Sequence, residues 1–537
     1  MEPGAWRPGK RGRSWFALAV VLVFVASLVG ACAGPAKEAK PEKTMVIAMD
    51  VGDASSMDPA VAFETASIFT AHQCYDNLVT FEGGDLSKPG PELAESWEVS
   101  QDGLVWTFKL KKGLKFPSGE PVTAAAVAYS FDRVIALDDQ PAWLLTQTGM
   151  EVGSTKALDE STVQITLKEK FNPDAFLAVL TYPVASVVDP KVCKEHEKDG
   201  DWGKNFLAGA SAGNGPYILE KWEPEVQVVL KANPNYWKGK VPMSTVIVKH
   251  VPESTAQKML LEKGDAQIAM DLRPEQIKDL EGKSGFQIIR GLGDGINYLG
   301  MNVAYQPFKD NRVRDAVRWA IDYDGLVKHV LQENAIVLQT FIPKGYKGYN
   351  PDTPYQQDVE KARQLLKEAG YPNGLKAELL CSSGVAGGGV YWRDIAAKLK
   401  DDLAKVGITV EIKEMTSAAL LDIYRAQKHQ MVLMGWGPDY PDPDALAKPF
   451  ANHRMKQLTW RNSYYNDDLA DKVDKAAAAF ASDERLQLYR ELTDYVLHNG
   501  PFAILYQPRV SIAMRDSVLN YQYNSLWTTE LASIDLK

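Results

Sequence analysis

The alternation of strands and helices in the second half of the chain constrains its fold more than any other feature. A strand over 375–381 is followed by a helical stripe of apolar residues that Gly407 ends, and then by an alternating strand over 408–412. A further helix over 418–426 leads to an apolar strand over 431–434. Because strand-helix-strand units connect parallel strands, this order predicts an α/β fold with a mainly parallel, helix-covered sheet.

Ligands bind to such sheets outside the carboxyl ends of the strands. Two segments follow strand ends here, the Gly- and Ser-rich run 382–389, which includes the candidate Gly384, and the run 436–444. The first part of the second run, Trp436-Gly437-Pro438-Asp439-Tyr440, combines flat rings with a carboxylate, which suits an ammonium group beside an apolar wall. The alternative interpretation is a surface Asp in a Pro-rich turn beside a core Trp.

Turn and capping residues delimit the other predicted elements. Asp102-Gly103 is a turn signal between two strands of the segment 97–110, and Thr123 can cap a helix that runs to Ile135. Asn311 and Asp358 can cap two further helices with apolar stripes. Strands are expected at 44–50, 163–167, 217 onward, 245–250, 268–270 and 502–506, and helices at 62–78 and 485–498.

The amino terminus has the features of a signal peptide. Four basic residues within 7–13 precede an uncharged, mostly apolar run over 15–29, and small residues lead to Cys32. This arrangement resembles the lipobox of bacterial lipoproteins, so we expect a signal peptide over 1–31, lipidation of Cys32 and a flexible tether over 32–44. An ordinary signal peptide with an incidental Cys, or a signal anchor, is the alternative.

The charge balance argues against a nucleic-acid-binding protein, and the cysteine content limits the number of disulfides. The chain carries 60 Lys and Arg against 69 Asp and Glu, and it lacks the basic surplus of a nucleic-acid-binding protein. Loss of residues 1–31 removes four basic and one acidic residue, which changes the net charge from −9 to −12. Cys74, Cys193 and Cys381 then remain, and we expect small core residues with at most one disulfide.

No convincing catalytic or metal-binding pattern is found. Gly209-Ala210-Ser211-Ala212-Gly213 has the spacing of a nucleophile elbow, but a turn follows it where the elbow needs a helix. Cys193 and His196 lack a second pair of zinc ligands, and Asp439, Asp442 and Asp444 do not have EF-hand spacing. We therefore expect neither an enzyme nor a metal or cofactor site.

Several short sequence motifs are spread along nearly the whole chain after residue 44. The longest runs from Leu93 to Ala124 and includes Trp97-Glu98-Val99 and Phe116-Pro117-Ser118-Gly119. Others lie at 213–217, 233–237, 307–314 and 320–322. Together they resemble the signature of family 5 extracellular solute-binding proteins, the dipeptide-, oligopeptide- and nickel-binding components of ABC importers.

The resemblance implies a periplasmic-binding-protein-like fold of type II, with two lobes, a hinge and a ligand buried between them. We expect lobe 1 over 45–292 and 509–537, with an extra subdomain over 91–214, and lobe 2 over 293–508. In peptide-binding members, the Asp at the position of Asp439 pairs with the α-amine of the peptide. We add Trp436, Tyr440, Gly384 and Met57 as ligand-binding candidates.

The resemblance further implies capture of di- or oligopeptides and delivery to the transmembrane permease of an ABC importer. Dipeptide-binding members place an Arg for the ligand carboxylate in the loop that matches 382–389, whereas the nearest Arg here is Arg393. A longer peptide, or another amine-bearing or polar solute, is therefore an alternative to a dipeptide. Oligosaccharide, opine or chelated nickel is the alternative cargo, and an extracytoplasmic hydrolase is a distant alternative. We expect a monomer, lipid-anchored in the periplasmic space or on the outer face of the cell membrane.

Overall fold

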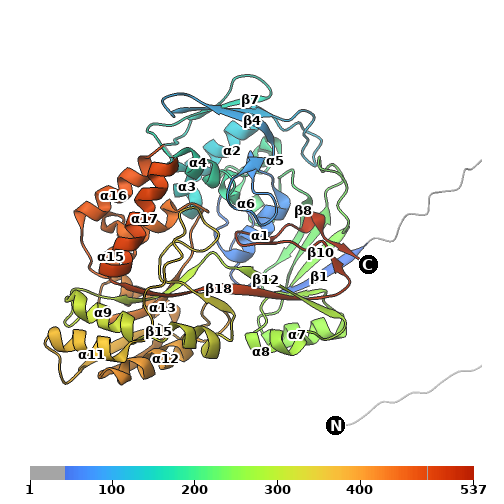
Figure 1. The fold of residues 1–537 in the computed structure, drawn as a ribbon. Coiled ribbons are helices and arrows are strands. Elements are labelled where there is room, and N and C mark those ends of the chain that lie inside the picture. The colour runs from blue at the N-terminus through green and yellow to red at the C-terminus, as the bar shows by residue number, and fades with distance from the viewer. Residues whose placement is uncertain (1–42, 481) are drawn as a thin grey trace, which may run out of the picture. The chain divides into compact units, whose positions relative to one another are not determined.

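The computed structural model describes residues 43–480 and 482–537 (Figure 1). The predicted signal peptide, the lipidation site Cys32 and nearly all of the tether lie outside the described residues. None of the described helices is both long and apolar enough to cross a membrane.

One long strand, β18 (Phe502–Arg515), organises the main mixed sheet of twelve strands. Its first half pairs in antiparallel fashion with β13 (Ile296–Met301) and β14 (Ala335–Val337). Its second half pairs in the same way with β12 (Phe286–Leu292) and β11 (Ile268–Ala269). The change of partners falls between Pro508, opposite Ala335, and Arg509, opposite Leu292.

The predicted parallel unit is confirmed. β15 (Leu375–Ser382) pairs in parallel with both β16 (Ile408–Met415) and β17 (Met431–Trp436). The connecting helices are α12 (Trp392–Lys405) and α13 (Ser417–Arg425). β13 runs antiparallel to β17 on the other side, so the whole sheet is mixed rather than mainly parallel. α9 (Asn311–Ala320) and α11 (Val359–Glu368) pack against each other beside this unit (Figure 1).

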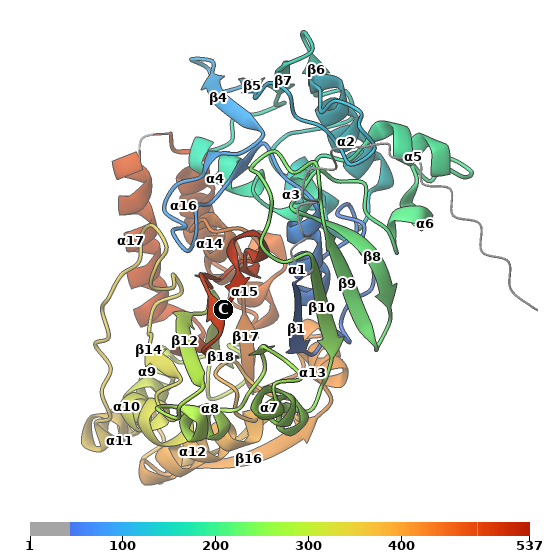
Figure 2. The same ribbon diagram turned by 90° about the vertical axis from the view of Figure 1, so that its right-hand side faces the viewer.

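The opposite end of the main sheet is built from the first strand of the chain. β1 (Thr44–Met49) pairs in parallel with β10 (Thr245–His250), and β9 (Gln227–Ala232) and β8 (Tyr217–Glu223) continue the sheet (Figure 2). α1 (Thr65–Cys74) contacts β8. α7 (Ser254–Lys263) and α8 (Pro274–Leu280) follow β10 and β11 in the chain.

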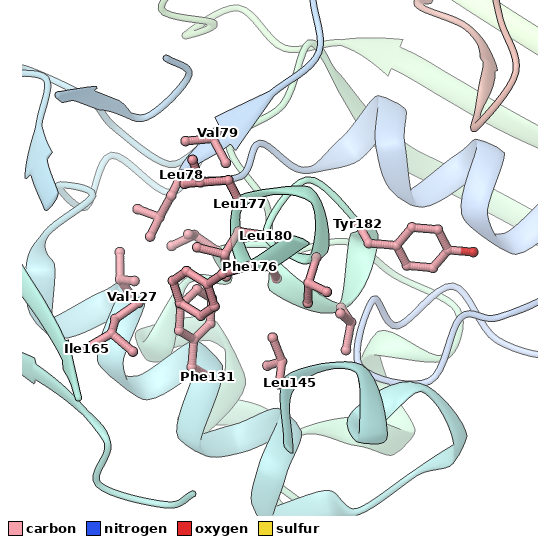
Figure 3. Packing of buried hydrophobic residues seen from close by; sticks show 14 of the residues in the cluster. Leu78, Val79, Val127, Phe131, Leu145, Ile165, Phe176, Leu177, Leu180 and Tyr182 are labelled. Atoms are coloured by element: carbon pink, nitrogen blue, oxygen red, sulfur yellow. The ribbon is translucent and has the colours of Figure 1, made fainter. Parts of the chain in front are cut away.

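A separate four-stranded antiparallel sheet has the order β4, β5, β7, β6. These strands span Ala94–Val99, Val105–Leu110, Thr162–Thr166 and Thr155–Ala157. The sheet shares a hydrophobic core with α2 (Ala124–Leu137) and α4 (Pro173–Val179). Figure 3 shows Phe131, Ile165 and Phe176 meeting in this core.

A group of helices follows β17. It contains α14 (Asp444–Ala451), α16 (Asp467–Ala478) and α17 (Ser482–Asn499), which contact one another. The remaining short helices and strands are α3 (Trp143–Thr146), α5 (Pro190–His196), α6 (Lys204–Leu207), α10 (Tyr323–Gly325), α15 (Leu458–Arg461), β2 (Val79–Thr80), β3 (Gly90–Pro91), β19 (Val518–Leu519), β20 (Tyr523–Asn524), β21 (Thr528–Thr529) and β22 (Asp535–Leu536).

Capping explains where several helices begin. Thr123 accepts a hydrogen bond from Ala126 N–H and Asp358 accepts one from Lys361 N–H, as predicted. The predicted cap Asn311 is wrong by one position, because Asp310 accepts from Arg312 N–H and Asn311 is the first helical residue. The three described cysteines are buried and free.

Candidate functional site

The register of two strands brings the chain segments around Asp294 and Asp439 to one edge of the main sheet. β13 and β17 are antiparallel, and Ile296 at the start of β13 pairs with Trp436 at the end of β17. Asp294 precedes that pair by two residues and Asp439 follows it by three. Two carboxylates that are far apart in the sequence therefore leave the sheet at the same edge.

Asp439 is a half-buried carboxylate without a cationic partner. It forms no hydrogen bond or ion pair with any residue of the described chain. Burial raises its pKa to about 6, because desolvation disfavours the charged form. A cation from outside the chain would remove this cost.

The next two aspartates along the chain, Asp442 and Asp444, are already neutralised. Arg485 donates to both oxygens of Asp442, with Nη1 2.9 Å from Oδ2. Lys448 Nζ lies 2.6 Å from Asp444 Oδ2. Asp439 is thus the one aspartate of the run 436–444 whose charge the described chain leaves uncompensated.

Trp436 and Tyr440 flank Asp439 in sequence but differ in their environments. Trp436 packs at the border of a hydrophobic cluster, and its indole N–H is buried without a hydrogen-bond partner in the described structure. Tyr440 is only 1% exposed, and its hydroxyl donates to Asp444 Oδ2 over 2.8 Å. Tyr440 therefore fixes the loop, whereas Trp436 keeps an unused donor.

Asp294, which belongs to none of the sequence motifs, lies in the connection between β12 and β13. Burial is the main cause that raises its pKa, to about 7, and the charge of Asp439 raises it further. The peptide N–H groups of Asp294 and Gly295 partly offset these effects. Asp294 forms no ion pair with a described residue.

A small cavity of about 210 Å³ has Gly293, which precedes Asp294 in the chain, in its lining. Its lining comes from segments that are distant in sequence: Gly84, Leu86, Leu292, Gly293, Lys344, Gly345, Tyr346, Tyr523 and Ser525. The charge of Asp294 contributes to raising the pKa of Tyr346 and of Tyr523, after the larger effect of burial. The pKa of Tyr182 is raised mainly by burial and further by the charges of Asp439 and Asp294. Figure 3 shows the hydroxyl of Tyr182 pointing away from the hydrophobic core.

Backbone groups of the loop over 382–389 form hydrogen bonds within the loop and with the residue that begins α12. Gly384 N–H donates to Ser382 Oγ over 3.0 Å, and Gly384 C=O accepts from Trp392 N–H over 3.2 Å. Gly387 lies so close to Asn297 that an added Cβ atom would be 2.9 Å from its Nδ2. The loop therefore packs on the same edge of the sheet as Asp439, but the N–H of Gly384 is already bonded.

Met57 lies in the core on the β1 side of the sheet. It is 1% exposed, and its N–H donates to Ala208 C=O over 3.0 Å. Its side chain is packed among other apolar groups, and it does not line the cavity that contains Gly293 and Tyr346. Met57 thus lies in the core and not in the lining of this cavity.

The segment with elbow-like spacing is a loop, as predicted. It follows α6 and leads into β8, and Ser211 Oγ accepts a hydrogen bond from Leu219 N–H over 2.9 Å. Among the described residues, no group of three or more His, Cys, Asp and Glu side chains is arranged to hold a metal ion.

The fold is that of the two-lobe periplasmic binding proteins. The structure matches the ABC transporter-associated periplasmic binding protein DppA from Helicobacter pylori, solved in complex with the peptide STSA. The TM-score is 0.75 at 26% identity, and the match covers 92% of this chain and 98% of that one.

Sequence comparison agrees over nearly the whole chain. The probable D,D-dipeptide-binding periplasmic protein DdpA of Escherichia coli K12 is 30% identical over 506 residues, which are 93% of this chain and 95% of DdpA. The glutathione-binding protein GsiB of the same strain is 28% identical over 494 residues, which are 90% of this chain and 91% of GsiB. The model of bacterial extracellular solute-binding proteins, family 5 Middle, matches residues 88–456, and the chain belongs to this family. It is therefore an extracytoplasmic solute-binding protein.

Proposed function

We propose that this protein captures peptides outside the cytoplasm and delivers them to the permease of an ABC importer, with the peptide α-amine held by Asp439. The observation that carries the proposal is the carboxylate of Asp439, which follows β17 and has no ion-pair partner among the described residues. The names of two relatives, a D,D-dipeptide-binding and a glutathione-binding protein, and the STSA-bound structure support a peptide cargo.

The chemistry of the loop fits a peptide amino terminus. A carboxylate that has lost part of its hydration is stabilised when an ammonium group donates hydrogen bonds to it. Trp436 has an unused indole N–H that can donate to a peptide carbonyl group. Tyr440 contributes by holding the loop through Asp444 rather than by touching the peptide.

The cargo is not restricted to dipeptides. The loop over 382–389 contains no Arg for a peptide carboxylate, and the guanidinium of Arg393 lies over the ring of Tyr391, 4.4 Å from its centroid. Arg393 does not line the cavity that contains Gly293 and Tyr346. A peptide whose carboxylate lies farther from the amine suits this arrangement better than a dipeptide does.

The binding cycle is closure of two lobes about a hinge. We propose lobe 1 over 45–292 and 509–537, with an extra subdomain over 91–214, and lobe 2 over 293–508. The partner change of β18 between Pro508 and Arg509 supports this division. Ligand contacts to both lobes would shift the population toward the closed form that docks on the permease.

The protein acts as a monomer without a catalytic step or cofactor, and we propose that lipidated Cys32 holds it at the membrane. The basic and apolar amino-terminal run before Cys32 supports this anchor. Membership of the family of extracellular solute-binding proteins supports binding rather than catalysis as the activity of this protein.

Native mass spectrometry of protein purified without denaturation tests the cargo. We expect bound masses that fragment as peptides with a free amino terminus. A bound oligosaccharide, opine or nickel chelate would contradict the peptide proposal and leave the transport role. Turnover of a bound compound by the purified protein would contradict the role as a binding protein.

A further inference from the structure

Two carboxylates face the same small region, and the described chain supplies no cation for either. The charge of Asp439 acts on Asp294, and neither aspartate forms an ion pair with a described residue. Lys344 lines the adjacent cavity, but it is exposed and does not lower the pKa of Asp294 or Asp439. The region therefore has two carboxyl groups for the one α-amine that a peptide brings to Asp439.

Tyr346 gives an independent indication of a missing ligand group. Its side chain is 8% exposed, and its hydroxyl is buried without a hydrogen-bond partner among the described residues. It lines the cavity and is close enough to Asp294 to respond to its charge. A buried hydroxyl left unpaired is costly, so a ligand atom that bonds to it would stabilise the complex.

We infer that Asp294 and Tyr346 form a second cation subsite, which takes the charged side chain of the first residue of the bound peptide. The inference rests on the proposed function and deepens it by naming the cargo class, peptides that begin with a lysine- or arginine-like residue. The α-amine would donate to Asp439. The side-chain cation would donate to the Asp294 carboxylate and to the Tyr346 oxygen.

The strand register places the carboxylates of Asp439 and Asp294 where the first residue of a bound peptide can contact both. The α-amine and the side chain of the first residue leave the same Cα atom, and Asp439 and Asp294 leave the sheet beside the same Trp436–Ile296 pair. Tyr523, whose ring lies against Gly291 of β12, borders the cavity beside this pair. Its ring can cover the apolar stem of a long cationic side chain.

Calorimetry with two synthetic tripeptides tests the subsite. The probes are Lys-Ala-Ala and its Nε-acetyl-lysine counterpart, which keeps the α-amine and loses the side-chain charge. We expect the wild-type protein to prefer the charged peptide by about tenfold or more. In Asp294→Asn the ratio of the two dissociation constants should fall to about one. Asp401→Asn, an exposed change on α12, is the matched control and should keep the wild-type ratio.

The outcomes separate the subsite from the proposed function. Equal affinity of the wild-type protein for both peptides, or an unchanged ratio in Asp294→Asn, would overturn the subsite while peptide binding stands. Binding of neither peptide would overturn both. If Asp294→Asn does not fold, Tyr346→Phe provides the second variant, and an unchanged ratio there would overturn the subsite.

Discussion

Arg485 and Asp442 form a buried ion pair at the base of the loop that carries Asp439. Arg485 Nη1 lies 2.9 Å from Asp442 Oδ2, and both side chains are almost fully buried. Arg485 belongs to α17 and Asp442 to the loop after β17, so the pair ties the loop to the helices behind it. The neighbouring Asp439 has no such partner in the described part of the chain, and the contrast between the two aspartates defines the candidate site.

Removal of Arg485 should destabilise the protein strongly. In Arg485→Met, Asp442 stays buried without its partner, and we expect a loss of about 3–5 kcal/mol in the free energy of unfolding. Chemical denaturation measures this change. Arg290→Met, which breaks an exposed pair with Glu281, is the matched control and should cost less than about 1 kcal/mol. Equal losses in the two variants would contradict the structural role of the Arg485–Asp442 pair.

Peptide affinity should fall as the pH is lowered through the pKa of Asp439. Only the ionised carboxylate pairs with an ammonium group, and the pKa of Asp439 in the free protein is raised to about 6. Calorimetry between about pH 5 and pH 8 should therefore show weaker binding on the acid side in the wild-type protein. Asp439→Asn removes one of the two site carboxyl groups that titrate in this range, so the affinity of the variant should depend less on pH. The same dependence in both proteins would contradict the amine-anchor role.

The stability of the free protein should change with pH in the opposite sense. The pKa of Asp439 is higher in the folded protein than its ordinary value of 3.8, so the folded state binds this proton more tightly. The contribution of Asp439 to the free energy of unfolding should fall as the pH rises from about 4 to about 6, and the loss is complete above that range. Asp439→Asn should stabilise the ligand-free protein above about pH 6 and have a smaller effect at about pH 4. Thermal denaturation at both pH values checks this.

The unused indole N–H of Trp436 gives a prediction with its own control. Trp436→Phe should weaken peptide binding by about three- to tenfold, because one hydrogen bond to the ligand is lost. Trp222→Phe removes a second buried and unpartnered indole N–H, on β8, and should leave the affinity as it is. Comparable losses in both variants would show that the Trp436 effect is general packing.

An ion pair between the two proposed lobes should favour the closed form. Lys347 Nζ lies 2.8 Å from Asp174 Oδ2, and nearby Asn172 Nδ2 donates to Ala479 C=O over 2.7 Å. Because the ion pair is partly exposed, Lys347→Ala should raise the dissociation constant only about two- to fivefold. Lys191→Ala, which breaks a pair with Glu120 inside the proposed lobe 1, is the control. An equal effect of the two changes would contradict the closure role.

The sequence predicts the local elements well where periodicity and caps agree. The parallel unit of β15, β16 and β17 and the helices capped by Thr123 and Asp358 follow from apolar spacing and side-chain acceptors. The predicted strand over 502–506 is too short, because Pro508 suggests an end. Pro508 is tolerated since it lies where β18 changes partners, and its carbonyl accepts from Gly293 N–H over 2.9 Å.

Only some residues of the candidate site can be predicted from the sequence. Asp439 and Trp436 follow a predicted strand end, so their position is predictable from the order of elements. Asp294 belongs to no motif, and its place beside Asp439 depends on the long-range pairing of Ile296 with Trp436. The burial of Met57 and Tyr440 depends likewise on tertiary packing, which local patterns do not report.

We propose that Asp439 binds the free amino terminus of a peptide. The decisive measurement is calorimetry with a peptide identified in the purified protein and with the same peptide acetylated at its α-amine. In the wild-type protein we predict that acetylation weakens binding by about tenfold or more, and that Asp439→Asn loses most of this difference. Equal affinity of the wild-type protein for the free and the acetylated peptide would show that Asp439 does not hold the amino terminus.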